Sequence, residues 1–402
     1  MSSDLASSPQ WPPLRYETLL WDSRPEPGTT SRSQLLRHRG PYKAAIPLEI
    51  AERRLNLPGH IQSLAEDASH EIARFDADLG GEIAPFGTVL LRSESAASSQ
   101  IEQLTASARA IAEAEIGDTG RHNAAQIVAN TRAMTAAIAM ADQLDGDSIL
   151  AMHRALMDAA EPDIAGTWRT SQVWVGGSAL GPHGALFVAP HHSRVPAAID
   201  DLMTFARRND LPVLAQAAIA HAQFETIHPF PDGNGRTGRA LLHAMLRNKH
   251  LTRNVTVPVS AGLLTDTGVY FQALDAYRAG DLGPIVGRLS EASFLAIANG
   301  RQLVDELHAI RADWDDRISA RRGAAAWRVA DLLIRRPVIN AQVVVAELGI
   351  GANNVYRTLE PLQAAGVLTE FTDRRRGRAW RSSEVLTALD AFAARAGRRT
   401  RG

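Results

Sequence analysis

The amino-acid sequence predicts a mainly helical protein with a β-hairpin in its middle and a helix-turn-helix plus basic hairpin at its C-terminal end. Three observations support this fold class. Most of the chain has apolar residues at the three-to-four-residue spacing of a buried helix face. Residues 166–192 instead combine Gly, Pro and β-forming residues at strand-like spacing. After residue 321, two short helical patterns precede an Arg-rich turn between two strand-like stretches.

The elements are expected in the following order. A short strand near residues 19–21 comes first, and residues 41–58 are expected to contain an extended stretch and a short helix. Ile61, Leu64 and Phe75 then lie on one face of a helix over residues 60–78, which the following pair of glycines ends. Further helices are expected over residues 90–97, 98–114, 124–144, 148–157, 195–207, 214–225, 237–248, 269–278, 282–297, 300–314, 327–334 and 351–365, and residues 335–350 are expected to form a turn, a helix and a turn.

Composition narrows the class of protein. The 402 residues suffice for two or three domains, and 45% hydrophobic and 22% charged residues are ordinary for a globular chain. The absence of cysteine excludes disulfides, thiolate catalysis and Cys-ligated metals. The polar start does not resemble a signal peptide, and no run of about 18 apolar residues occurs. We therefore expect a cytoplasmic protein with no membrane partner.

The net charge of −1 conceals an uneven distribution. Residues 321–402 hold 15 Lys and Arg against 7 Asp and Glu, whereas the preceding residues hold 28 against 37. This asymmetry indicates that the C-terminal segment has a different, anionic partner.

The stretch HPFPDGNGRTGR, from His228 to Arg239, carries the strongest chemical signal. Gly233 and Gly235 allow the backbone to turn and approach a ligand closely. A helix follows, and its N-terminal N–H groups favour anions. Arg236 and Arg239 lie in its first turns, where their planar guanidinium groups suit phosphate oxygens.

Two further side chains complete this pattern. Asp232 offers the hard oxygen ligand that Mg²⁺ uses between a protein and phosphates. His228 is a candidate general base. The pattern predicts a site for a metal-bound polyphosphate beside a proton acceptor. The alternative, a Gly-rich helix cap alone, leaves these side chains unexplained, and no P-loop or dinucleotide fingerprint occurs.

The stretch resembles the signature of the Fic family, His-x-Phe-x-Asp/Glu-Gly-Asn-Gly-Arg-x-x-Arg, at every fixed position. The resemblance implies a helical Fic core that transfers AMP from ATP to a Ser, Thr or Tyr hydroxyl of a target protein. A relative that phosphorylates its target has Ala-Asn-Lys in place of residues 233–235, so the Gly-Asn-Gly form favours adenylyl transfer. Another nucleotide stays open, because the base is read elsewhere.

The resemblance also assigns roles within the motif. His228 would deprotonate the target hydroxyl, Asp232 would hold Mg²⁺, and Phe230 would anchor the loop in the core. The residues implied to bind the phosphates of ATP are Gly233, Asn234, Gly235, Arg236 and Arg239, with Arg236 near the α-phosphate and Arg239 at the γ-phosphate.

The hairpin resembles the Fic flap, which adds main-chain hydrogen bonds to a target segment. Its edge is expected near residues 171–176, and its turn near residues 181–184. An ordinary surface hairpin is the alternative. His191 and His192 invite a metal site, but a loop pair without a third ligand is more often solvated.

The stretch SSQIEQL resembles the inhibitory motif of the family, Ser/Thr-x-x-x-Glu-Gly/Asn. Ser98 and Glu102 have the required spacing within an inhibitory helix over residues 98–103. The resemblance implies that Glu102 reaches Arg239 and blocks the γ-phosphate site. Gln103 departs from the Gly or Asn of the family, which puts the strength of the inhibition in question.

The C-terminal pattern is typical of a winged helix. Its second helix and basic turn supply candidate DNA contacts, which are Asn354, Arg357, Arg374, Arg375 and Arg376. Winged helices also serve protein contacts, and this alternative stays open.

The sequence therefore predicts three parts. Residues 1–95 form an N-terminal segment and the N-terminal region of the Fic fold. Residues 96–315 form the Fic core with the inhibitory helix (98–103) and the active-site motif (228–239), and residues 320–395 form the winged helix. The predicted function is a protein adenylyltransferase restrained by its own glutamate, with Mg²⁺ and ATP, acting on an unidentified protein or on itself. A nucleotide-responsive DNA-binding regulator and a de-AMPylating enzyme are the alternatives, and a homodimer is one open assembly state.

Overall fold

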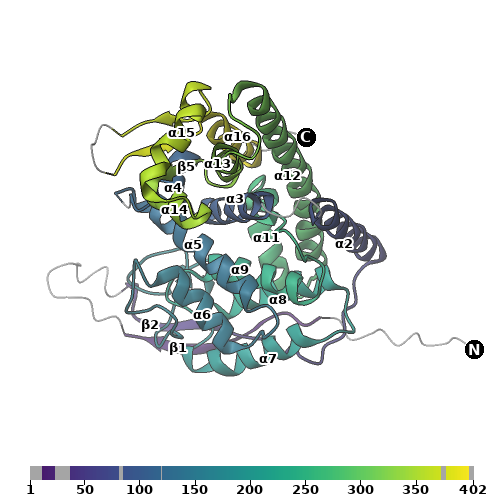
Figure 1. The fold of residues 1–402 in the computed structure, drawn as a ribbon. Helices are drawn as coiled ribbons and strands as arrows, with labels where there is room; N and C mark the ends of the chain where they lie inside the picture. The colour runs from purple at the N-terminus through teal and green to yellow at the C-terminus, as the bar shows by residue number, and fades with distance from the viewer. Residues whose placement is uncertain (1–10, 23–36, 81–84, 119, 373–376, 398–402) are drawn as a thin grey trace, which may run out of the picture. The chain divides into compact units, whose positions relative to one another are not determined.

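The structure is a computed structural model that describes residues 11–22, 37–80, 85–118, 120–372 and 377–397. It is mainly helical, and its described strands form small antiparallel sheets (Figure 1). The chain divides into two compact units, each assembled from separate stretches. The first comprises Met1–Asp67, Ala136–Lys249 and Gly268–Ser290, and the second comprises Ala68–Thr135, His250–Thr267 and Glu291–Gly402. Among the described helices, none has the length and apolar character needed to cross a membrane.

The first unit contains the active-site motif. The residues of helices α2, α5 and α12 are divided between the two units, and the first residue of α11, Thr267, is assigned to the second unit. The elements wholly or partly in this unit are β1 (Arg15–Trp21), β2 (Gly40–Ile46), α2 (Gly59–Gly80), α5 (His122–Ala139), α6 (Gly146–Met157), β3 (Trp174–Val175), β4 (Phe187–Val188), η1 (His192–Arg194), α7 (Val195–Arg207), α8 (Val213–Ile227), α9 (Asn234–Asn248), α11 (Thr267–Arg278) and α12 (Gly283–Arg317).

Helix α8 is the centre of the first unit. Its residues from Leu214 to Ile227 are all buried, as expected for a helix that is packed on every side. Helices α7 and α9 pack against it. Gly238 lets α9 approach closely, because a Cβ atom there would lie 2.9 Å from Cδ1 of Phe224. The active-site motif thus connects two tightly packed helices.

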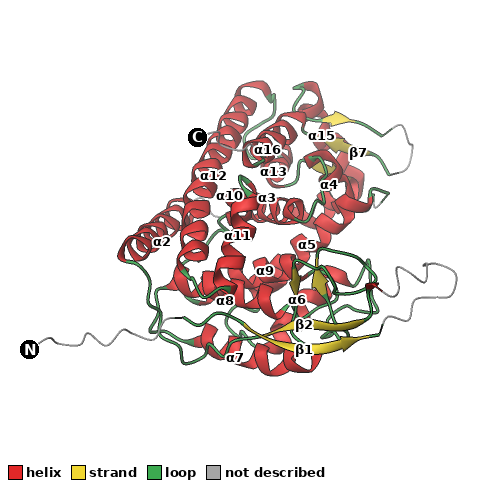
Figure 2. Cartoon of the chain, turned by 180° about the vertical axis from the view of Figure 1, so that it is seen from behind, coloured by secondary structure: helices red, strands yellow, loops and turns green. Residues whose placement is uncertain are grey.

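Two hairpins lie beside this helical core (Figure 2). β1 pairs with β2, and β3 pairs with β4, both antiparallel. Trp21 joins the two hairpins: its ring meets Trp174 edge-on at 5.3 Å, and its indole N–H donates to the Leu180 carbonyl at 3.0 Å. The predicted hairpin in residues 166–192 is therefore present, and Trp21 of β1 packs against it.

The second unit contains the segment with Ser98 and Glu102 and the C-terminal elements. Besides its shares of α2, α5 and α12, its elements are α3 (Pro85–Ile101), α4 (Ala108–Glu115), α10 (Val259–Leu264), α13 (Ala325–Arg335), β5 (Val338–Asn340), α14 (Ala341–Leu348), η2 (Ala352–Asn354), α15 (Val355–Ala364), β6 (Thr369–Glu370), β7 (Ala379–Arg381) and α16 (Ser383–Ala396).

The C-terminal elements share a core with α3. Helices α13 and α16 pack on α3, and Trp314 and Trp380 are fully buried in the common core. The three short strands pair in the order β5-β7-β6. Consequently, the segment with Ser98 and Glu102 lies in the same compact unit as the C-terminal elements.

Several predicted boundaries are wrong. One helix, α3, replaces the predicted break between residues 97 and 98, and the chain turns after Ile101 instead. Gln103 has a left-handed backbone (φ 65°), which interrupts helical hydrogen bonding until Ser107 caps α4. The helices predicted over residues 282–297 and 300–314 are one 35-residue helix, α12.

Residues 47–58 contain no helix, contrary to the prediction. Their backbone groups bond to distant side chains: Asp201 accepts from the Ile50 and Ala51 N–H groups, and Gln223 donates to the Leu48 carbonyl. Helix α10 was not predicted, because its six residues are too few for a periodic pattern.

Candidate active site

The active-site motif forms a loop between α8 and α9. His228 caps the C-terminus of α8 with a left-handed backbone (φ 49°), and Gly233 precedes α9 with φ 76°. A Cβ atom on Gly233 would lie 3.0 Å from Leu156 and 3.2 Å from the Met157 sulfur. Glycine is therefore required there both by its backbone conformation and by the close packing of α6.

Asn234 closes this loop through its side chain. The Phe230 N–H donates to Asn234 Oδ1 at 2.9 Å, and Asn234 Nδ2 donates to the Phe230 carbonyl at 2.8 Å. The sequence placed Asn234 among the phosphate-binding residues. Because its amide is buried and engaged in this pair, the side chain shapes the loop rather than pointing out of it.

Phe230 anchors the loop in the core, as expected. Its ring is fully buried and stacks on His153 at a centroid distance of 3.6 Å. His153 Nδ1 accepts from the Gly166 N–H at 3.0 Å, so its other nitrogen carries the proton and donates to the Asp232 carbonyl at 3.1 Å. Burial lowers the pKa of His153 to about 4, which keeps the ring neutral near neutral pH.

Sequence reasoning missed His153. It lies in α6, 79 residues before the Asp232 carbonyl that it contacts, and a single histidine on a helix carries no motif. Only the packing of α6 against α9 brings it to the loop.

The imidazole of His228 is partly exposed and lies close to Glu225. Its side chain is 19% exposed, and its Nδ1 faces the Glu225 carbonyl oxygen at 3.4 Å. A carbonyl only accepts hydrogen bonds, so this contact favours a proton on Nδ1 and leaves the lone pair on Nε2. The Glu225 carboxylate lies 3.9 Å from the same nitrogen.

The charged residues of the motif differ in exposure. The arginines are buried, Arg236 at 5% and Arg239 at 1% exposed, whereas the Asp232 side chain is 58% exposed. Asp232 lies 3.5 Å from the Arg236 guanidinium. The two arginines at the start of α9 supply guanidinium groups of the kind that bind phosphate oxygens, at a helix end that favours anions.

Asp232 fits the role of a Mg²⁺ ligand. Mg²⁺ in nucleotide sites commonly uses one or two carboxylates together with phosphate oxygens and water, and Asp232 is an exposed carboxylate beside the anion-binding loop. Within the described residues, no group of three or more His, Asp or Glu side chains forms a metal site without such help. His191 instead bonds Ser193, with 2.8 Å between Nδ1 and Oγ.

The expected flap edge, residues 171–176, includes β3. Strand β3 pairs with β4 on one side, and the Leu186 N–H donates to the Val175 carbonyl at 2.9 Å. Val175 and Leu186 are exposed, at 40% and 87%. The hairpin therefore carries exposed apolar side chains beside its short ladder.

Ser98 and Glu102 lie at the end of α3. Ser98 is fully buried, whereas Glu102 is exposed in the turn that follows. Asn130 holds this part of α3 by donating to the Ser95 carbonyl and to Ser99 Oγ. The predicted inhibitory helix over residues 98–103 is thus helical only to Ile101.

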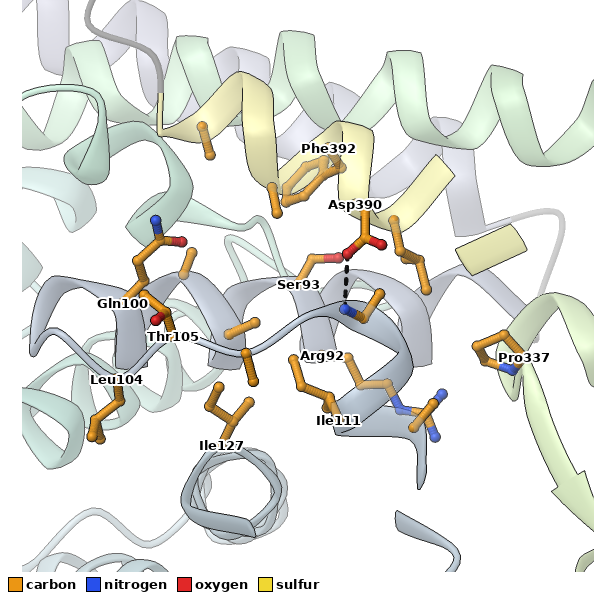
Figure 3. Close-up of a pocket in the computed structure, with 18 of the residues that line it drawn as sticks. Arg92, Ser93, Gln100, Leu104, Thr105, Ile111, Ile127, Pro337, Asp390 and Phe392 are labelled. Atoms are coloured by element: carbon orange, nitrogen blue, oxygen red, sulfur yellow. Dashed lines mark hydrogen bonds between the residues drawn. The ribbon is translucent and has the colours of Figure 1, made fainter. Parts of the chain in front are cut away.

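A cavity of about 80 Å³ lies along α3, α4 and α16 (Figure 3). Its lining is mainly apolar and includes Leu104, Ile111 and Phe392. At its edge, the Ala108 N–H donates to the Asp390 carboxylate at 2.8 Å. Ala108, six residues after Glu102, thus connects the start of α4 to α16.

The candidate DNA contacts are only partly described. Asn354 and Arg357 are exposed at the start of α15, where Arg357 donates to Asn354 Oδ1 at 3.0 Å. The other three candidates, Arg374, Arg375 and Arg376, lie outside the described residues. The neighbouring Arg378 pairs with Glu370 and stacks on aromatic rings, which leaves it less available for phosphate.

Comparison with known protein families finds a match over the region that contains this site. Residues 143–246 match the model of the Fic/DOC family. The chain contains a Fic domain. The matched residues include the whole active-site motif, α6 with His153, and the β3–β4 hairpin.

The Fic domain is similar to several curated proteins. The chain is 34% identical over 155 residues to "Protein adenylyltransferase fic-1" of Caenorhabditis elegans, which covers 38% of this chain and 28% of that protein. It is 45% identical over 64 residues to "Probable protein adenylyltransferase aq_aa38" of Aquifex aeolicus, covering 16% of this chain and 20% of that protein. The matched segment thus spans less than a third of these relatives.

A solved structure has a similar fold over a larger part of the chain. A Fic family protein from Desulfovibrio desulfuricans G20 matches with a TM-score of 0.52 and 22% identity, over 82% of this chain and 97% of that one. The similarity at this identity concerns the fold alone.

Proposed function

We propose that this protein is a protein adenylyltransferase, which transfers AMP from ATP to a Ser, Thr or Tyr hydroxyl of a target protein. The observation that carries the proposal is the loop between α8 and α9. It combines a partly exposed imidazole, an exposed carboxylate and two buried arginines at a helix start. The names of the curated relatives support the same activity.

The proposed reaction needs one proton acceptor and a well-placed anion site. The target hydroxyl oxygen attacks the α-phosphorus of ATP, the bond from that phosphorus to the bridging oxygen of the β-phosphate breaks, and pyrophosphate leaves. His228 Nε2 takes the hydroxyl proton. Arg236 and Arg239 stabilise the phosphate charge, and Asp232 would hold Mg²⁺, which supplies further charge neutralisation when bound.

We further propose that Glu102 restrains the enzyme by occupying the phosphate-binding guanidinium of Arg239. A carboxylate competes with a phosphate for an arginine through its charge and volume. The turn after α3 supports the assignment, because Gln103 has φ 65° where the inhibitory motif carries Gly or Asn. Those two residue types adopt left-handed backbone most readily, so the turn has the conformation for which the motif is suited.

Replacing Gln103 with glycine is expected to stabilise this turn by about 1 kcal/mol, because glycine carries no penalty at a left-handed position. The Gln103→Gly variant should show a higher free energy of unfolding in urea and slower AMP transfer, since Glu102 is held more firmly. Gln103→Asn should lie between the two. Equal stability of Gln103→Ala and Gln103→Gly would contradict the strain argument.

We also propose that residues 320–395 form a winged-helix module that binds DNA. The order of α13, β5, α14, α15, β6 and β7 supports the module, and the exposed Asn354 and Arg357 at the start of α15 support base contacts. The excess of basic residues after residue 321 supports an anionic partner.

Arg357→Ala is expected to weaken binding to a fluorescent DNA duplex by about 1–3 kcal/mol if Arg357 reads a base. Fluorescence anisotropy at two salt concentrations measures the effect, with the exposed Arg321→Ala as control. Retention of DNA only in the presence of ATP, without any AMP transfer, would favour the regulator instead. Absence of DNA binding by the intact chain would favour a protein partner.

A further inference from the structure

Arg169 links three backbone segments around the motif. Its side chain is 3% exposed. Its guanidinium donates to the carbonyls of His228 at 2.7 Å, Ser171 at 2.9 Å and Pro190 at 2.5 Å, and more weakly to that of Ile227 at 3.4 Å.

These carbonyls belong to functionally distinct parts of the domain. Ser171 and Pro190 are the first and last residues of what we call the flap hairpin, residues 171–190. His228 is the proton acceptor at the end of α8. The Arg169 N–H also donates to the Pro229 carbonyl at 3.0 Å. A planar, rigid guanidinium therefore fixes both ends of the flap hairpin relative to the backbone of His228.

The charge of Arg169 is balanced without a carboxylate. All of its hydrogen bonds go to carbonyl oxygens. Burial lowers the pKa of Arg169 to about 10, so the side chain stays protonated at neutral pH and keeps its donors. A lysine has no planar fork and cannot reproduce this pattern in full.

We propose that Arg169 is a positioning residue for AMP transfer, which sets the distance between the target segment on the flap hairpin and the imidazole of His228. This inference rests on the proposed function and adds to it the link between target binding and proton removal. His228 has a left-handed backbone (φ 49°), a conformation that a non-glycine residue keeps only when its surroundings hold it.

The affinity for ATP and the rate of AMP transfer depend on different contacts and can be measured separately. Arg236 and Arg239 come from α9 and are not bonded by Arg169, so the phosphate site does not depend on it directly. In contrast, the target hydroxyl must lie almost in contact with the imidazole of His228. A misplacement of about 1 Å lowers the rate roughly a hundredfold. Loss of Arg169 should therefore lower the transfer rate more than the affinity for ATP.

The test compares Arg169→Met with Arg169→Lys and with Arg208→Met. Arg208 is the control, because it also donates to two carbonyls, those of Ala51 and Arg53, outside the motif; unlike Arg169, it additionally pairs with the Asp210 carboxylate. Each variant is made in the 402-residue chain and in its Glu102→Gly variant. Hydrogen exchange by mass spectrometry, the dissociation constant for ATP, and the rate of self-labelling from ATP labelled at the α-phosphate are measured.

Arg169→Met is expected to raise exchange at least about tenfold in both the flap hairpin and residues 227–231. It should slow labelling about 10- to 100-fold with the ATP dissociation constant within about twofold. Arg169→Lys should recover part of the rate, and Arg208→Met should change neither segment.

If hydrogen exchange rises in only one of these segments, or in neither, Arg169 does not couple the flap hairpin to residues 227–231. A parallel loss of ATP affinity would overturn the positioning role, because it would indicate general loosening. If the Glu102→Gly parent transfers no AMP, both the proposed function and the role of Arg169 in transfer are wrong. The hydrogen-exchange data then still show whether Arg169 couples the flap hairpin to residues 227–231.

Discussion

Replacing His228 with asparagine is expected to lower AMP transfer by about 10²- to 10⁴-fold, the range for loss of a general base. Asparagine adopts the left-handed backbone (φ 49°) of this position readily, so the α8 C-terminus should stay intact. The side chain no longer offers the Nε2 lone pair that accepts the hydroxyl proton. Transfer of label from ATP labelled at the α-phosphate to the chain or to a lysate measures the loss.

The matched control for this variant is His191→Asn. His191 lies outside the motif, just after the flap hairpin, and its Nδ1 is 2.8 Å from Ser193 Oγ, so its loss should leave transfer nearly unchanged. ATP binding should persist in His228→Asn, because the arginines of α9 are untouched. Wild-type transfer by a folded His228→Asn variant would remove the histidine from the mechanism and with it the proposed reaction.

Replacing Glu102 with glycine is expected to raise AMP transfer by roughly 5- to 150-fold, the usual range of a regulatory coupling energy. Glu102 is exposed in the turn after α3, so the change should cost the second unit little stability. Under the proposed restraint, this change makes the guanidinium of Arg239 available to the phosphates of ATP. Initial rates of self-labelling compare the variant with the parent chain.

The Glu102→Gln variant separates charge from volume. If the carboxylate charge provides the restraint, Gln should release most of the activity, whereas a restraint by volume leaves Gln inhibited. Unchanged transfer in both variants would show that the inhibitory assignment is wrong. A loss of AMP release from a pre-modified protein in both variants would instead assign Glu102 to de-AMPylation.

Local patterns in the sequence predicted much of the Fic domain correctly. Helix α7 has the predicted bounds, and α6, α8 and α9 begin and end within a few residues of them, because their apolar residues repeat with the helical period over several turns. Phe230 was expected in the core and is fully buried there. The residues of the motif are contiguous, so their shared loop followed from the chain itself.

Errors arose where distant residues decide the local conformation. In residues 47–58, where a helix was predicted, the Ile50 and Ala51 N–H groups bond to the carboxylate of the distant Asp201. Backbone groups bond wherever a partner satisfies them, and such partners lie far away in sequence.

The sequence by itself determined which chemical groups the site has: an imidazole, a carboxylate, two guanidiniums and a glycine loop before a helix, all within twelve residues. Only the tertiary structure decided how they are held. His153 supports the loop from α6, and Arg169 joins the flap hairpin to His228 across 59 residues of sequence. A short motif specifies side chains, whereas their orientation depends on buried polar groups that find partners only after the chain has packed.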